Sequence, residues 1–150
     1  MQPSEKIKKK IKEFEGVRLK AYRCPAGVLT IGYGHTGPDV KEGMIITRQR
    51  ADRLFDEDIN IFARSVEKAV SQPALTQNQF DALVSLAYNI GIGGLKKSQL
   101  LKQVQADPNC GSIYNEFMRH NKARVKGVLK ELPGLTRRRR AEADHYFGRG

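Results

Sequence analysis

Apolar side chains recur every three or four positions along most of the chain, which is the spacing of one face of a helix. The longest such stripe runs from Ala51 to Val70, where Thr47 is a suitable N-cap and Pro73 ends the pattern. The same spacing predicts further helices over residues 4–15, 76–90, 95–105 and 112–121, and a last helix that begins at Thr136. In the helix 76–90, Thr76 and Gln79 form a capping box.

Residues 15–37 break this helical pattern. Five glycines punctuate the stretch: Gly16, Gly27, Gly32, Gly34 and Gly37. Short apolar runs at residues 19–22 and 28–33 predict two strands of a hairpin, followed by a loop at residues 35–39 and a third short strand at residues 43–46. Because glycine in a strand often marks a close approach of the backbone to a ligand, we expect this sheet to line a binding cleft with Glu15 at its edge.

The whole pattern predicts a single α+β domain, residues 1–150, with two lobes. We expect residues 14–46 to form a small lobe built on the β-hairpin sheet, and residues 73–150 to form a larger, all-helical lobe. A long connecting helix within residues 47–72, about 35 Å in length, would join them. The cleft would lie between the lobes, bordered by the N-terminal helix 4–15.

The C-terminal part is strongly basic. Residues 122–132 are expected to be partly loop, and Pro133 with Gly134 marks a turn. If Thr136 caps the last helix, residues 137–140, all arginine, fall in its first turn. Apart from one of these arginines, we expect this run to be a solvated basic face.

The net charge of +11 and the pI near 9.9 indicate an anionic partner. Nucleic acid and the bacterial wall fit this charge equally well. No apolar run is long enough to span a membrane, and residues 1–14 lack the apolar core of a signal peptide, so we expect the protein to stay in the cytoplasm until something else releases it. The two cysteines fit no metal-ligand spacing, and we expect no disulfide between them.

Three polar residues in the glycine-rich stretch are spaced as in the signature of the phage-type lysozymes, the endolysins that hydrolyse bacterial peptidoglycan. That signature has Glu, eight residues, Asp or Cys, five residues and Thr, and it resembles Glu15, Cys24 and Thr30 within the strings EGVRLKAY and TIGYGHT. The strings TQNQFDALVSLAYNIG and LPGLTRRRRAEADHYF extend the resemblance over most of the chain.

The resemblance implies a lysozyme-like fold and a muramidase that cuts the β-1,4 bond between N-acetylmuramic acid and N-acetylglucosamine, causing host-cell lysis. Glu15 would be the general acid, which must be protonated when it acts. Cys24 replaces the usual Asp. Arg23 and the positive field could lower the pKa of the Cys24 thiol. The resulting thiolate could orient water, stabilise the transition state or act as nucleophile. The alternative is that Cys24 is a half-buried thiol without chemistry. Thr30 would hold the attacking water, or is an ordinary strand residue.

The resemblance also implies substrate-binding or supporting roles for His35, Thr36, Tyr88, Asn89, Arg137 and Arg138. Tyr88 either borders the sugar groove with Asn89 or packs in the core. One of Arg137 and Arg138 would pair with Glu15 and orient it.

Peptidoglycan is therefore the expected partner, and the protein is expected to be a monomer that binds no specific nucleic acid and has no membrane span. We expect no cofactor and no metal, because the three histidines have no metal-binding spacing. The alternative is a non-catalytic basic protein that binds the wall or nucleic acid.

Overall fold

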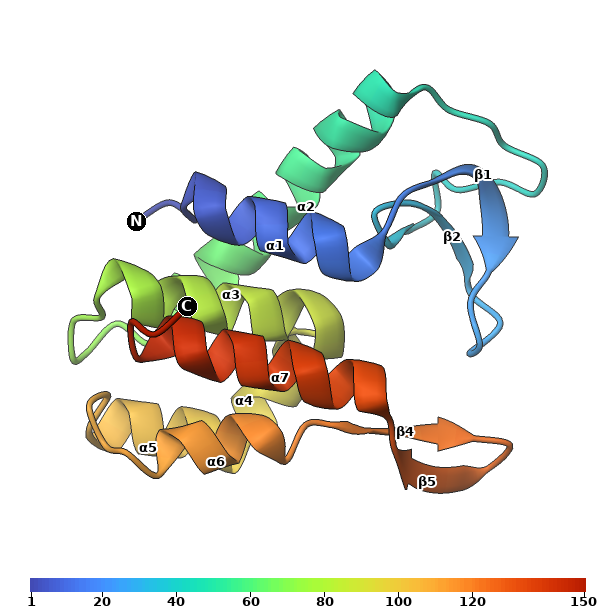
Figure 1. Ribbon diagram of the computed structural model, residues 1–150. Coiled ribbons are helices and arrows are strands. Elements are labelled where there is room, and N and C mark those ends of the chain that lie inside the picture. The colour runs from blue at the N-terminus through green and yellow to red at the C-terminus, as the bar shows by residue number, and fades with distance from the viewer. The chain divides into compact units, whose positions relative to one another are not determined.

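A computed structural model describes all residues from 1 to 150 (Figure 1). The helices are α1 (Glu5–Glu15), α2 (Arg48–Ala69), α3 (Gln77–Ile90), α4 (Ile92–Lys97), α5 (Gln99–Ala106), α6 (Ile113–Met118) and α7 (Pro133–Tyr146). The strands are β1 (Arg18–Arg23), β2 (Leu29–Gly32), β3 (His35–Thr36), β4 (Lys122–Val125) and β5 (Val128–Glu131). This mixture confirms the α+β class. The chain divides into two compact units, residues 5–61 and residues 1–4 with 62–150. The lobe boundaries expected near residues 46 and 72 stay a prediction.

The unit of residues 5–61 contains a three-stranded antiparallel sheet in the order β1-β2-β3. The sequence predicts a loop from His35, but His35 and Thr36 pair with Ile31 and Thr30 as β3. Gly34 has a positive φ of 80°, and this conformation lets the chain fold straight back onto β2. The strand predicted at residues 43–46 is reduced to one bridge between Lys20 and Ile45.

A small apolar core holds this sheet in place. Ile31, Val40 and Leu54 form its buried centre, and Ala21, Leu29, Met44 and Ile46 pack around them. The rings of Tyr33 and Phe55 pack edge to face, with their centroids 5.6 Å apart. Because Leu54 and Phe55 belong to α2, this core joins the sheet to the first half of that helix.

Helix α2 follows its predicted pattern. The Thr47 hydroxyl accepts a hydrogen bond from the Arg50 N–H at 3.1 Å, as expected of an N-cap. The apolar stripe is buried from Ala51 through Ile59 to Val66. None of the helices combines the length and the apolar composition needed to cross a membrane.

In the other unit, α3 is the central helix. Thr76 and Gln79 form the predicted capping box, with hydrogen bonds of 3.0 and 3.1 Å. Every residue from Gln79 to Ala87 is buried, as expected of a helix surrounded by others. Figure 1 shows α7 lying alongside α3, and the two helices are in contact.

Three predicted elements of this unit differ in the structure. The helix predicted at residues 95–105 is split at Ser98, whose hydroxyl accepts from the Leu101 N–H and caps α5. Residues 122–131, expected as partly loop in an all-helical lobe, form the antiparallel hairpin β4–β5. Helix α7 begins at Pro133 rather than after Thr136, because proline is well suited to the first position of a helix.

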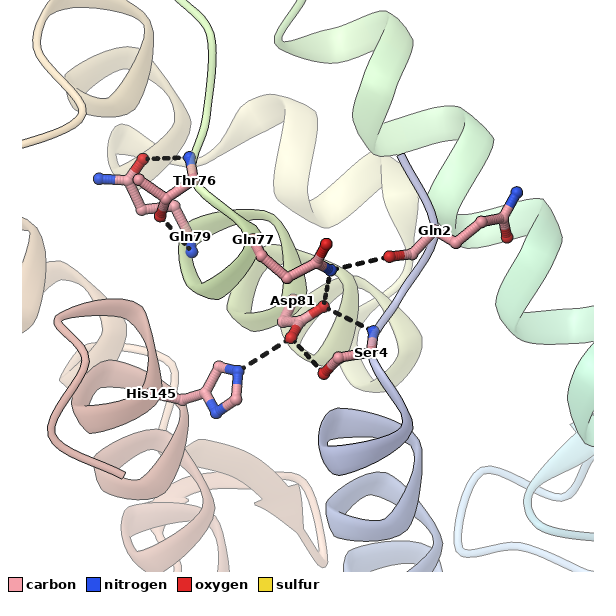
Figure 2. Close-up of polar contacts among 7 residues, drawn as sticks. All are labelled: Gln2, Ser4, Thr76, Gln77, Gln79, Asp81 and His145. Carbon is pink, nitrogen blue, oxygen red and sulfur yellow. Dashed lines mark hydrogen bonds and ion pairs between the residues drawn. The ribbon is translucent and has the colours of Figure 1, made fainter.

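A buried carboxylate ties three segments of this unit together. Asp81 on α3 accepts hydrogen bonds from the Ser4 N–H at 3.0 Å, from Gln77 at 2.8 Å and from the His145 ring at 3.0 Å (Figure 2). Gln77 also donates to the carbonyl of Gln2 at 2.7 Å. Burial raises the pKa of Asp81, but the bonds from His145 and Ser4 outweigh it, so the pKa is lowered overall.

We expect Asp81→Asn to lower the free energy of unfolding by about 2–3 kcal/mol at neutral pH, because the buried partners lose their charged acceptor. The folded-state pKa of Asp81 lies below its ordinary value, so its contribution is present above about pH 3.9 and is lost as the pH falls through the folded-state pKa. Urea unfolding at neutral pH and at about pH 3 should therefore show the difference shrinking in acid. The exposed Asp56, changed to Asn, is the control. An equal loss at both pH values would contradict the prediction.

Candidate active site

Glu15 is the last residue of α1, and its carboxylate lies against the turn between β2 and β3. A Cβ atom built on Gly34 would stand 2.8 Å from Glu15 Oε1. Since Gly34 also has a φ of 80°, any other residue there would be strained and would push the carboxylate away. At Gly34 the group that lies close to the backbone is the Glu15 carboxylate, whereas the glycine pattern predicted a ligand; the approach of a ligand stays a prediction.

His35, next to Gly34, is held from both sides by carboxylates. Its Nδ1 lies 2.7 Å from Asp58 on α2, and its Nε2 lies 3.0 Å from Asp39. Burial lowers the pKa of His35, but the hydrogen bonds to Asp58 and Asp39 outweigh burial and raise it overall. Burial also raises the pKa of Asp58. The imidazole thus acts as a clamp between two carboxylates, and its bond to Asp58 fixes β3 to α2.

Cys24 opens the turn from β1 to β2. Its N–H donates to the Val28 carbonyl at 3.0 Å, and the Gly27 N–H donates to its carbonyl at 2.8 Å. The pKa of the Cys24 thiol is lowered, first by backbone hydrogen bonds from Val28 and then from Ala26; the Thr30 side chain and Gly27 add less, and desolvation opposes them. Thiolate character is therefore favoured by the amides of the turn.

Arg23, which the sequence predicts to lower the pKa of the Cys24 thiol, contacts other groups. Its guanidinium donates to the Gly27 carbonyl at 2.9 Å and to Glu42 at 2.9 Å. The structure therefore corrects the expectation: backbone N–H groups, rather than the neighbouring cation, make the largest contributions to the lowered pKa of Cys24.

Thr30 lies next to Cys24 across the hairpin. Its side chain is only 4% exposed, and its hydroxyl donates to the Val28 carbonyl at 2.9 Å. The same carbonyl accepts from the Cys24 backbone N–H, so one backbone group bonds both residues. The hydroxyl oxygen of Thr30 keeps lone pairs that can accept a hydrogen bond from water.

The residues predicted to bind or support the substrate also include Thr36, Tyr88 and Asn89, and they differ in exposure. Thr36 is exposed on β3. In the unit that contains α3, Tyr88 is half-buried and its ring lies 5.4 Å from that of Phe62, whereas Asn89 is exposed. Their predicted place at a sugar groove stays a prediction.

The arginine run of α7 does not form one solvated face. Arg137 is exposed, but Arg138 and Arg139 are 5% and 0% exposed and share the carboxylate of Glu142 at 3.2 and 2.8 Å. Arg138 also donates to the Ser85 carbonyl at 3.2 Å, and Arg139 to that of His120 at 3.3 Å. The arginine run predicts a solvated face, but Glu142 lies one turn further along the same helix and neutralises buried arginines. The pairing of Arg137 or Arg138 with Glu15 stays a prediction.

Sequence reasoning missed Asp58 and Asp39 as partners of His35. Asp58 is 23 positions away and only the fold brings it close, whereas Asp39 at four positions offered a weak signal. No group of three or more His, Cys, Asp or Glu side chains is arranged to hold a metal ion.

Comparison with known proteins identifies this architecture. The structure of the endolysin from Escherichia coli O157:H7 phage FAHEc1 superposes with a TM-score of 0.87 and 43% identity, covering 97% of this chain and 93% of that chain. The fold is therefore that of the lysozyme-like glycoside hydrolases. A family model described as phage lysozyme matches residues 12–142, and the chain belongs to the phage lysozyme family.

Sequence relatives agree with this assignment. The endolysin of Acyrthosiphon pisum secondary endosymbiont phage 1 is 44% identical over 142 residues, which cover 95% of each chain. The endolysin of Bacillus phage B103 is 42% identical over 134 residues, 88% of this chain but 49% of the relative, so the chain spans about half that relative's length. The protein is thus a glycoside hydrolase of the muramidase type, which favours the enzyme over the non-catalytic alternatives.

The clamp on His35 predicts a pH-dependent stability. Its folded-state pKa is raised, so its contribution is fully present below the ordinary His pKa of about 6.5 and is lost as the pH rises through the folded-state value. We expect His35→Gln to lower the free energy of unfolding by about 1 kcal/mol or more near pH 6, and by less near pH 9.

His120→Gln provides a control of opposite sign in the same urea unfolding series. Burial first, and then the charge of Arg139, lower the pKa of His120. Its contribution is therefore present at high pH and is lost as the pH falls through the folded-state pKa. Parallel pH trends for the two variants would contradict the clamp.

Proposed function

We propose that this protein is an endolysin that hydrolyses the β-1,4 bond between N-acetylmuramic acid and N-acetylglucosamine in peptidoglycan, with Glu15 as the general acid. The observation that carries the proposal is the position of the Glu15 carboxylate, which lies where a side chain at Gly34 would otherwise be. A general acid must be held in one orientation toward the glycosidic oxygen. The missing side chain of Gly34 leaves the space beside the turn that the carboxylate occupies.

Cys24 and Thr30 complete the chemistry in this proposal. Glu15 gives its proton to the leaving oxygen as the glycosidic bond breaks. A water molecule attacks the anomeric carbon from the opposite side of the sugar and transfers its proton to the Cys24 thiolate. Thr30 accepts a hydrogen bond from that water and orients it. The lowered pKa of the Cys24 thiol and the shared Val28 carbonyl support this pairing.

The relatives named as endolysins support the biological role in this proposal. The protein would act as a monomer on the bacterial wall and cause host-cell lysis, after release from the cytoplasm through a membrane opening made by another protein. The net charge of +11 suits a substrate with carboxylates and phosphate-bearing polymers.

The direct test is digestion of purified peptidoglycan in heavy-oxygen water, followed by mass spectrometry. Wild-type enzyme should produce reducing-end N-acetylmuramic acid that carries one heavy oxygen, and Glu15→Gln should reduce the rate by more than about a hundredfold with the fold intact.

Gly34→Ala should lose about tenfold or more of this activity, because the added methyl displaces the Glu15 carboxylate. Its matched control is Gly43→Ala, which has a similar positive φ of 76° but open space around it. Normal activity of folded Glu15→Gln, or anhydro-muramic products without label, would overturn the proposal.

The role of Cys24 is tested by two substitutions of similar size. Cys24→Asp should largely keep the activity, because a carboxylate can accept the same backbone hydrogen bonds and the proton of water. Cys24→Ser should lose about a hundredfold, since a serine hydroxyl stays protonated. Rates on peptidoglycan should also fall for wild type, but not for Cys24→Asp, as the pH drops through the lowered pKa of the thiol. If Cys24→Ser matched wild type, the thiol would carry no chemistry.

A further inference from the structure

The hairpin β4–β5 projects from the unit that contains α3, between α6 and α7 (Figure 1). Seven of its eight strand residues are exposed, and Ala123 is the half-buried exception. Its turn consists of Lys126 and Gly127, both with positive φ, as two-residue hairpin turns of the common type require. Lysine is an unfavoured residue at such a φ, and strain of this kind is common at functional sites.

The end of the hairpin exposes apolar side chains on both of its faces. Val125 and Val128 are cross-strand neighbours on one face, and Leu129 lies opposite Arg124 on the other. Their exposed fractions are 36%, 55% and 57%. A partner protein or a glycan strand would cover one face of a hairpin, whereas immersion in a fluid phase covers both.

Cations surround this apolar end. The strands and turn carry Lys122, Arg124, Lys126 and Lys130 against one acidic residue, Glu131, which lies at the base of the hairpin opposite Lys122. The Arg124 guanidinium donates to the Gly127 carbonyl at 3.2 Å, so its charge sits at the turn beside Lys126. The hairpin has no aromatic side chain on which a sugar ring could stack.

We propose that the β4–β5 hairpin is a membrane-docking element that inserts Val125, Val128 and Leu129 into the interface of an anionic lipid bilayer while its cations bind the headgroups. Apolar side chains at the boundary of the acyl region and basic residues at the headgroup level are the two parts of interfacial binding. This function is separate from hydrolysis and does not depend on Glu15 or Cys24.

The absence of tryptophan from the chain allows a direct test. Leu129→Trp places a single indole at the end of the hairpin, and Ile61→Trp places one on α2 at a similar exposure of 54%. With vesicles of phosphatidylcholine containing a quarter phosphatidylglycerol, Leu129→Trp should shift its emission to the blue and be quenched by brominated acyl chains. Ile61→Trp should do neither, and pure phosphatidylcholine should give a much smaller shift.

A second pair of variants separates the hairpin from the overall charge. Arg124→Gln/Lys126→Asn removes two hairpin charges and keeps a residue that suits the turn; Lys68→Gln/Lys102→Gln removes two charges from exposed helix positions. Each basic residue at an anionic membrane contributes roughly fivefold to the affinity. The hairpin double variant should therefore bind vesicles more than about tenfold more weakly, and the control double variant less than about twofold more weakly. Equal losses would assign binding to the net charge alone and overturn the proposal. So would an unshifted indole, or hairpin variants that lose binding to purified peptidoglycan while vesicle binding is unchanged.

Discussion

The hydrogen bond between His35 and Asp58 fixes the turn beside the proposed acid. Strand β3 has only two residues, so its backbone bonds to β2 hold the turn weakly. The imidazole adds a bond of 2.7 Å to α2 and another to Asp39 within the same loop. Both partners of the imidazole are carboxylates, and hydrogen bonds to a carboxylate are stronger than those between neutral groups. Gly34 is thereby kept under the Glu15 carboxylate by contacts that a short strand could not supply.

The second half of the site relies on backbone groups instead of side chains. The amides that lower the pKa of the Cys24 thiol belong to the turn formed by residues 24–28. They are present whatever residue occupies position 24, and they would stabilise the negative charge of a carboxylate in the same way as that of a thiolate. The turn therefore gives a physical reason why a signature can accept either Asp or Cys at one position. Arg23 supports the turn through the Gly27 carbonyl rather than through its charge on the sulfur.

The sequence predicted the features that depend on local pattern. Helix α2, the capping box of α3 and the hairpin around Cys24 follow from apolar spacing, caps and turn residues. It did not predict β3, because two residues between glycines carry no strand pattern, or the break at Ser98, because apolar spacing continues across it. The clamp on His35 depends on Asp58, and the burial of Arg139 depends in part on the His120 carbonyl; only tertiary structure brings these groups close. Roles in catalysis came from family resemblance rather than from periodicity.

The distribution of charge changes how the basic character of the chain should be understood. The arginines of α7 look like the strongest cationic surface, yet Arg138 and Arg139 are buried and share Glu142. Burying two guanidinium groups costs solvation that one carboxylate only partly restores, so the carbonyls of Ser85 and His120 are needed as further acceptors. These two charges hold α7 in place and cannot meet an anionic surface. The cations left to do so stand on exposed elements, and on the hairpin β4–β5 they stand beside exposed valine and leucine. The proposed attraction to an anionic surface therefore belongs to an element that is separate in the sequence from Glu15, Cys24 and Thr30, the residues proposed for catalysis.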